Sequence, residues 1–124
     1  PEGFATTLAQ VRSYASQAGR DPVSLRTAFY MTVNLNRDAQ AASKEADGFI
    51  RSYYGLNFWP DKWGPFGPPE AVAQRILEYW RAGAQEVIVR FASYDQRGQL
   101  ETFLRQAVPA VRQASASVTA KPSF

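Results

Sequence analysis

The sequence of 124 residues predicts an α/β fold with parallel strands, and three observations carry this prediction. Segments with apolar residues at helical spacing alternate with two segments rich in β-branched and aromatic residues. The first of these two segments has two largely uncharged faces, which is typical of a strand covered on both sides in a parallel sheet. A loop rich in Pro and Gly interrupts the pattern. The expected order is helix, strand, helix, loop, helix, strand, helix.

The first half of the chain predicts a strand between two helices. Residues 4–18 place apolar side chains on one helical stripe, and Gly19 stands where helices commonly end in a left-handed residue. Residues 25–35 alternate as a strand. Asp38 is a suitable N-cap for the second helix, which we expect Gly55 to end.

The second half begins with a loop over residues 55–68, where Pro and Gly disfavour regular structure. Pro69 suits the first turn of a third helix, and Gly83 is expected to end it. Residues 87–92 predict a second strand that is almost continuously apolar.

The end of the chain predicts a helix and a tail. The fourth helix begins near Tyr94 or Asp95, and Pro109 is expected to kink or shorten its end. Residues 113–124 are low in complexity and predict a flexible tail.

The number of strands does not complete such a fold. Two buried parallel strands leave open edges, and each edge needs a neighbour. A closed eight-stranded barrel takes about 250 residues, roughly twice this length. The sequence also starts with Pro1 rather than Met, so we expect either a processed N-terminus or a part of a longer chain.

Four short motifs follow one another along the chain. Residues 14–22 read Tyr-Ala-Ser-Gln-Ala-Gly-Arg-Asp-Pro, and residues 67–73 read Gly-Pro-Pro-Glu-Ala-Val-Ala. Residues 79–89 read Tyr-Trp-Arg-Ala-Gly-Ala-Gln-Glu-Val-Ile-Val, and residues 100–112 contain Leu-Glu-Thr-Phe and Val-Pro-Ala-Val-Arg. In this order they resemble the passage before the seventh strand, the Gly-x-Pro-Glu-x-Val-Ala helix start, the approach to the eighth strand and the closing helix of luciferase-like flavin-dependent monooxygenases. The resemblance covers residues 3–112.

The resemblance implies the C-terminal portion of a TIM (β/α)8 barrel over residues 1–112, followed by the tail over residues 113–124. It implies FMN as cofactor, or the deazaflavin F420 in sister branches, and a small organic substrate that is oxidised with O2. The expected partners are the flavin, the substrate, and either the remainder of the barrel or a second copy of the chain. Without the earlier strands we expect this segment to be inactive.

Composition excludes several classes of function. The chain has 14 basic and 11 acidic residues, and its Arg residues are spread almost evenly rather than clustered as in nucleic-acid-binding proteins. It has no Cys and no His, which excludes thiolate chemistry, disulfides and a Ser-His-Asp triad in this segment. Without Cys or His ligands we expect no metal cofactor. We expect no membrane partner and a cytoplasmic location, because neither a membrane span nor a secretory signal is visible.

Polar residues at the ends of the two strands are the first site candidates, because barrel enzymes place their chemistry at the carboxyl ends of strands. These residues are Asn34, Asn36 and Arg37 after the first strand, and Ser93, Tyr94 and Asp95 after the second. Asn34 and Ser93 would hydrogen-bond a flavin edge or a substrate. The alternative for such residues is turn chemistry, since Asn and Ser often bond their own backbone.

Arg90 is the single charged residue inside the second apolar strand. A charge at that position needs a partner or access to water. Arg90 would therefore hold a sulfonate, carboxylate or phosphate group, or form an ion pair with a carboxylate outside this segment. Tyr30 in the first strand would line the same interior, although packing is its more common role.

The loop aromatics Trp59, Trp63 and Phe66 are candidates for a pocket wall. The alternative is contact with a neighbouring subunit or with the rest of a barrel, because interfaces favour such residues. Two further hypotheses follow. The chain is a non-catalytic fragment that self-associates through its open strand edges and this loop, or a small complete α/β binding domain.

Overall fold

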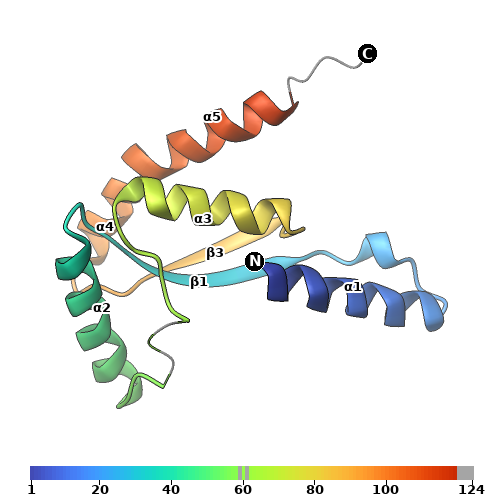
Figure 1. The fold of residues 1–124 in the computed structure, drawn as a ribbon, viewed down its shortest axis with the longest axis horizontal. Coiled ribbons are helices and arrows are strands. Elements are labelled where there is room, and N and C mark those ends of the chain that lie inside the picture. The colour runs from blue at the N-terminus through green and yellow to red at the C-terminus, as the bar shows by residue number, and fades with distance from the viewer. Residues whose placement is uncertain (59, 61, 120–124) are drawn as a thin grey trace.

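Three parallel strands form an open sheet in the order β2-β1-β3, and helices pack on one of its faces and beside its carboxyl end (Figure 1). This computed structural model describes residues 1–58, 60 and 62–119. The elements in chain order are α1 (Glu2–Gln17), η1 (Pro22–Ser24), β1 (Ala28–Leu35), α2 (Ala39–Tyr54), β2 (Phe66–Gly67), α3 (Pro69–Arg81), β3 (Glu86–Phe91), α4 (Gln96–Thr102), η2 (Phe103–Ala107) and α5 (Val108–Thr119). The predicted α/β class with parallel strands is confirmed.

The register of the sheet brings the carboxyl ends of the strands to one edge. β1 pairs with β3 from Ala28 opposite Glu86 to Val33 opposite Phe91. The two residues of β2 pair with the last two residues of β1. Because all pairs are parallel, residues that follow β1 and β3 emerge side by side.

One face of the sheet packs on helices. In Figure 1, α3 and α5 lie on the same side of β1 and β3, whereas α2 lies beside the carboxyl end of the sheet. Alternate residues of β1 point into the core beneath α3. The buried members of this core are Met31, Val33, Leu35, Val72, Ala73, Ile76, Phe91 and Ala107. We call this side of the sheet the helix-covered face and the opposite side the uncovered face.

The helix ends follow the predicted signals. The Asp38 side chain accepts hydrogen bonds from the backbone N–H groups of Gln40 and Ala41, which caps α2. Gly55 follows α2 with a φ of 81°, and Gly83 follows α3 with a φ of 111°. These conformations favour glycine, so both residues end their helices as expected.

The first strand differs from the prediction in two respects. It begins at Ala28, because residues Pro22–Ser24 form a short 3-10 helix capped by Asp21. The expectation that both faces of this strand are covered is wrong for its first half. Tyr30 is 49% exposed and Ile88 on β3 is 51% exposed, since the helices cover only the other face.

The sequence does not predict strand β2, which lies inside the expected loop. It consists of two residues and depends on hydrogen bonds with β1. The backbone N–H of Asn36 donates to the Gly67 carbonyl at 2.9 Å. A pairing this short leaves no periodic pattern in the sequence.

The last helical run accommodates Pro109 through a wider turn. η2 is a π-helical segment between α4 and α5, and it ends two residues before Pro109. Proline has no N–H, and its ring crowds the carbonyl four residues earlier, which here lies within η2. The helix therefore continues past the proline instead of ending there.

The predicted tail is partly helical. α5 continues through Thr119, which includes residues 113–119 of the expected flexible segment. Alanine favours helix, and the hydroxyl groups of Ser115 and Ser117 donate to carbonyls of the preceding turn. Residues 120–124 lie outside the described residues, and the division of the chain at residue 112 stays a prediction.

Candidate functional site

Two side-chain clusters lie near the carboxyl edge of the sheet. The first surrounds Glu45 of α2 and contains the predicted residues Asn34 and Ser93. The second surrounds Arg90 of β3 on the uncovered face and contains the predicted residue Trp63. We call them the Glu45 cluster and the Arg90 cluster.

Glu45 receives three hydrogen bonds from the strand ends. Its Oε1 accepts from the Ser93 hydroxyl at 2.5 Å and from the backbone N–H of Tyr94 at 3.1 Å. Its Oε2 accepts from Nδ2 of Asn34 at 3.2 Å. One carboxylate therefore joins α2 to the residues that follow β3 and to the end of β1.

These contacts keep Glu45 ionised. Burial favours the neutral acid and is the largest single influence on the pKa of Glu45. The hydrogen bonds from Ser93, Asn34 and the Tyr94 backbone together outweigh burial, and the pKa of Glu45 is lowered from its ordinary value. The group is thus a hydrogen-bond acceptor rather than a proton donor near neutral pH.

Asn34 and Ser93 are both fully buried, and their polar atoms are engaged within the chain. Nδ2 of Asn34 also donates to the Ala92 carbonyl at 2.9 Å, and its Oδ1 accepts from Gln99 at 3.4 Å. The Ser93 hydroxyl also accepts from the backbone N–H of Asp95 at 3.1 Å. This geometry favours the structural alternative for both residues, and a ligand contact for them stays a prediction.

Arg90 is surrounded by aromatic rings. Its Nη1 donates to the Tyr54 hydroxyl at 2.9 Å. Its guanidinium carbon lies 5.4–5.7 Å from four ring centroids. These rings belong to Tyr30, Tyr53, Tyr54 and Trp63. Cation–π attraction at such distances holds the guanidinium in place.

No carboxylate pairs with Arg90 in the part of the chain that the structure describes. Its Nε and Nη2 atoms are buried without a hydrogen-bond partner. The ion pair and the bound anion predicted for this residue both require a partner from outside these residues.

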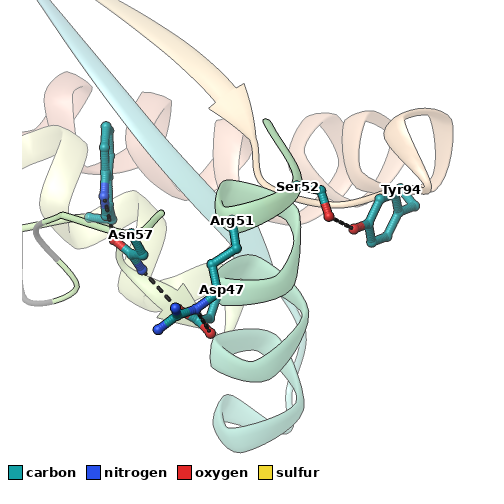
Figure 2. A network of polar contacts seen from close by, with 6 residues as sticks. Asp47, Arg51, Ser52, Asn57 and Tyr94 are labelled. Atoms are coloured by element: carbon teal, nitrogen blue, oxygen red, sulfur yellow. Dashed lines mark hydrogen bonds and ion pairs between the residues drawn. The ribbon is translucent and has the colours of Figure 1, made fainter. Parts of the chain in front are cut away.

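A polar network fixes Trp63, which contributes a ring to the Arg90 cluster. The indole N–H of Trp63 donates to Oδ1 of Asn57 at 3.0 Å, and Nδ2 of Asn57 donates to Asp47 at 2.9 Å. Arg51 donates to the other oxygen of Asp47 at 2.8 Å (Figure 2). The hydrogen bonds from Asn57 and then Arg51 lower the pKa of Asp47. Helix α2 therefore anchors the loop that presents Trp63.

Tyr94 lies on the outer side of the same helix and is 67% exposed. Its hydroxyl is 3.0 Å from the Ser52 hydroxyl (Figure 2). Its ring packs edge-to-face on Phe49 with centroids 5.6 Å apart. Tyr94 therefore belongs to neither cluster through its side chain.

A small apolar cavity adjoins the Arg90 cluster. Its volume is about 140 Å³, and Ile50, Tyr54, Leu56, Phe58 and Trp63 line it. Trp63 thus forms one wall of this cavity, and its role in a ligand pocket stays a prediction. Phe66 and Trp63 both pack against the buried cluster of Ala46, Ile50 and Ala92, and Trp59 lies outside the described residues.

Sequence reasoning missed Glu45, Tyr53 and Tyr54. A signal for Glu45 exists in the helical pattern, because it follows Ala42 by three residues and precedes Phe49 by four. A carboxylate on the inward stripe of a helix requires hydrogen-bond donors, and the strand ends supply them.

Comparisons with known proteins do not identify the chain. No protein-family model matches it, and no curated protein matches it. The luciferase-like family therefore stays a prediction from the four motifs. Across the described residues, no group of three or more acidic side chains gathers in a way that would hold a metal ion. None of the helices described here combines the length and the apolar character needed to cross a bilayer.

Proposed function

We propose that this chain supplies the last strands of a luciferase-like (β/α)8 barrel that acts as a flavin-dependent oxidoreductase. The observation that carries the proposal is the position of the Arg90 cluster, at the carboxyl end of parallel strands and on the uncovered face. In a closed barrel this face is the interior, and ligands bind at the carboxyl ends of the strands. The cytoplasmic location expected from the sequence belongs to the same proposal.

The open edges of the sheet support the proposal. In the described chain β3 pairs only with β1, and β2 contributes only two residues. Strand edges with free N–H and C=O groups require neighbours. Strands from the remainder of a barrel would satisfy them and would cover Tyr30 and Ile88.

The residues fit one wall of a flavin site rather than a whole site. Tyr54 and Trp63 stack with centroids 6.2 Å apart and offer flat apolar surfaces, and Arg90 offers a positive charge. The cavity of about 140 Å³ is smaller than the roughly 300–1,000 Å³ of ordinary ligand sites. The other walls would come from the remaining strands.

This geometry suggests a separate role for the flavin and for each residue of the two clusters. Bound FMN, or F420 in the alternative, would supply the redox chemistry with O2 and a small organic substrate. Arg90 would orient an anionic group, and the ring of Trp63 would exclude water from that contact. Glu45 would act as a positioning residue, because it holds the strand ends in place.

A flavin titration of the complete encoded polypeptide tests this function. We expect FMN or F420 to bind and to shift its visible absorbance spectrum. Trp63→Ala should weaken that binding, whereas Trp80→Ala, which alters a side chain that lines a separate cavity with Ile76 and Val111, should not. A complete polypeptide that binds neither flavin would contradict the proposal.

A second candidate is a non-catalytic chain that self-associates. The observation that favours it is the exposed uncovered face, with Tyr30 at 49% and Ile88 at 51% exposure beside two open strand edges. A second copy would bury these groups. Light scattering of the 124-residue protein separates the two cases, because this candidate requires a stable dimer with the uncovered face buried. A monomer at all concentrations excludes it.

A further inference from the structure

We propose that Arg90 and Thr32 form a binding site for an oxyanion, namely a carboxylate, sulfonate or phosphate group carried on an apolar ligand. The inference goes beyond the proposed flavin chemistry, because the anion can belong either to a flavin phosphate or to a substrate.

The Arg90 guanidinium has one edge without hydrogen-bond partners. Nη1 is occupied by the Tyr54 hydroxyl at 2.9 Å. Nε and Nη2 are buried and have no partner. These two atoms form one edge of the planar group, and this edge binds the two oxygens of an oxyanion through parallel N–H···O bonds.

Thr32 pairs with Arg90 in the sheet register. Side chains at paired positions of a parallel sheet project from the same face. Thr32 is 2% exposed, and its hydroxyl oxygen has no hydrogen-bond partner. Two neighbouring strands therefore each place unused hydrogen-bonding groups on one face. Leaving the Thr32 hydroxyl buried and unpaired costs free energy.

The positive charge of Arg90 also favours an anion as the ligand. The ion pairs of the described chain do not include Arg90. The two carboxylates of α2 at this end of the sheet are occupied, Glu45 by Ser93, Asn34 and the Tyr94 backbone, and Asp47 by Arg51 and Asn57. The positive charge of Arg90 is therefore not neutralised by a described side chain.

The rings of Tyr30, Tyr53, Tyr54 and Trp63 form an aromatic frame around the guanidinium. Rings stacked near a guanidinium stabilise its charge and leave its in-plane N–H groups available. They also exclude water, which strengthens a charge-assisted hydrogen bond. Tyr54 and Trp63 belong both to this frame and to the apolar cavity. A ligand with an anionic group beside an apolar ring or chain would thus contact both.

The test is a titration of the 124-residue protein with benzoate, methanesulfonate and inorganic phosphate, followed by NMR of the arginine Nε–H signals. Benzamide is the matched neutral probe for benzoate. We expect benzoate to shift the Arg90 signal and to bind at least about tenfold more tightly than benzamide. Arg90→Gln and Arg90→Lys should each weaken benzoate binding by about tenfold or more, since lysine keeps the charge but loses the paired donors. Arg97→Gln, which alters an exposed arginine paired with Glu101, should change nothing.

Thr32→Val tests the site with a variant that should fold as well as the wild type. It replaces an unpaired hydroxyl with a methyl group of similar size, so the melting temperature should stay the same or rise. Anion binding should nevertheless weaken about threefold or more. The inference is overturned if no oxyanion shifts the Arg90 signal, or if the wild-type protein and Arg90→Gln bind benzoate equally.

FMN and riboflavin, which differ by one phosphate, identify the source of the anion. Tighter binding of FMN that depends on Arg90 assigns the site to the flavin phosphate. Benzoate binding through Arg90 with no difference between FMN and riboflavin assigns it to a substrate anion. If neither flavin binds even to the complete polypeptide while benzoate binds through Arg90, the proposed function fails and the oxyanion site stands.

Discussion

Glu45 connects helix α2 to the ends of β1 and β3 through hydrogen bonds from Asn34, Ser93 and the Tyr94 backbone. Its lowered pKa means that the folded protein favours the carboxylate. A carboxyl group with a lowered pKa contributes stability in full above its ordinary pKa, which is 4.5 for this group. That contribution is lost as the pH falls through the lower value of the folded state.

We predict that Glu45→Gln lowers the free energy of unfolding at pH 7 by about 1–2 kcal/mol, because an amide replaces a charged acceptor of three hydrogen bonds. The variant should also lose less stability than the wild type when the pH falls below 4.5. Urea unfolding at several pH values measures both effects. Glu101→Gln is the control, because Glu101 forms an exposed pair with Arg97 and should change stability by less than about 0.5 kcal/mol. Parallel pH profiles for the wild type and Glu45→Gln would contradict this account.

Gly83 gives a second prediction at this scale. A Cβ at this position would lie 2.6 Å from Cδ2 of Leu8, and the φ of 111° disfavours any side chain. Gly83→Ala should therefore destabilise the protein by about 1–2 kcal/mol. Gly48→Ala is the matched variant, because a Cβ there meets nothing within 4 Å inside α2, and it should stabilise by about 0.5–1 kcal/mol. The melting temperatures of the two variants should shift in opposite directions. A shift in the same direction would refute the role given to the positive φ of Gly83.

Sequence reasoning identified Arg90 because a charge inside an apolar strand stands out. It did not identify the tyrosines of the Arg90 cluster. Tyr53 and Tyr54 end a helix that is distant from Arg90 in the sequence, and only the packing of α2 brings them near β3. Asn34 and Ser93 were recognised as polar residues at strand ends, but their pairing with Glu45 became visible only in three dimensions.

At the scale of elements, the packing of α2 depends on Ile50. Ile50 is fully buried among Ala46, Ala92 and the aromatic residues of the loop, and it also lines the apolar cavity. Ile50→Ala should cost about 2–5 kcal/mol, because it removes buried methyl groups and enlarges the cavity. Val23→Ala provides a control at a side chain that is 75% exposed and should change stability by less than about 0.5 kcal/mol. Denaturant unfolding followed by circular dichroism measures the difference, and equal stabilities would exclude this role for Ile50.

Helix boundaries were predictable because caps and glycines act locally. Asp38, Gly55 and Gly83 fulfil these roles as expected. β2 and the length of α5 were not predictable by the same means. β2 exists through pairing with β1, and a segment of Ala and Ser is compatible with both helix and coil until its packing is known.

At the scale of the molecule, alternating helices and strands predicted the parallel sheet, since parallel neighbours need crossover helices. The pattern does not reveal what pairs with the open edges. The uncovered face carries Arg90 and Thr32 with unused hydrogen-bonding atoms, together with the exposed Tyr30 and Ile88. A barrel interior would give all four residues a partner or a cover, as the proposed function requires.

The coding sequence around this segment tests whether the segment belongs to such a barrel. We predict that about five further strand–helix units precede Pro1 in the same reading frame, as an eight-stranded barrel requires. Sequencing the gene or its transcript measures this without assumptions about activity. A start codon immediately before Pro1, with no upstream units in frame, would contradict the barrel and would favour a free-standing domain.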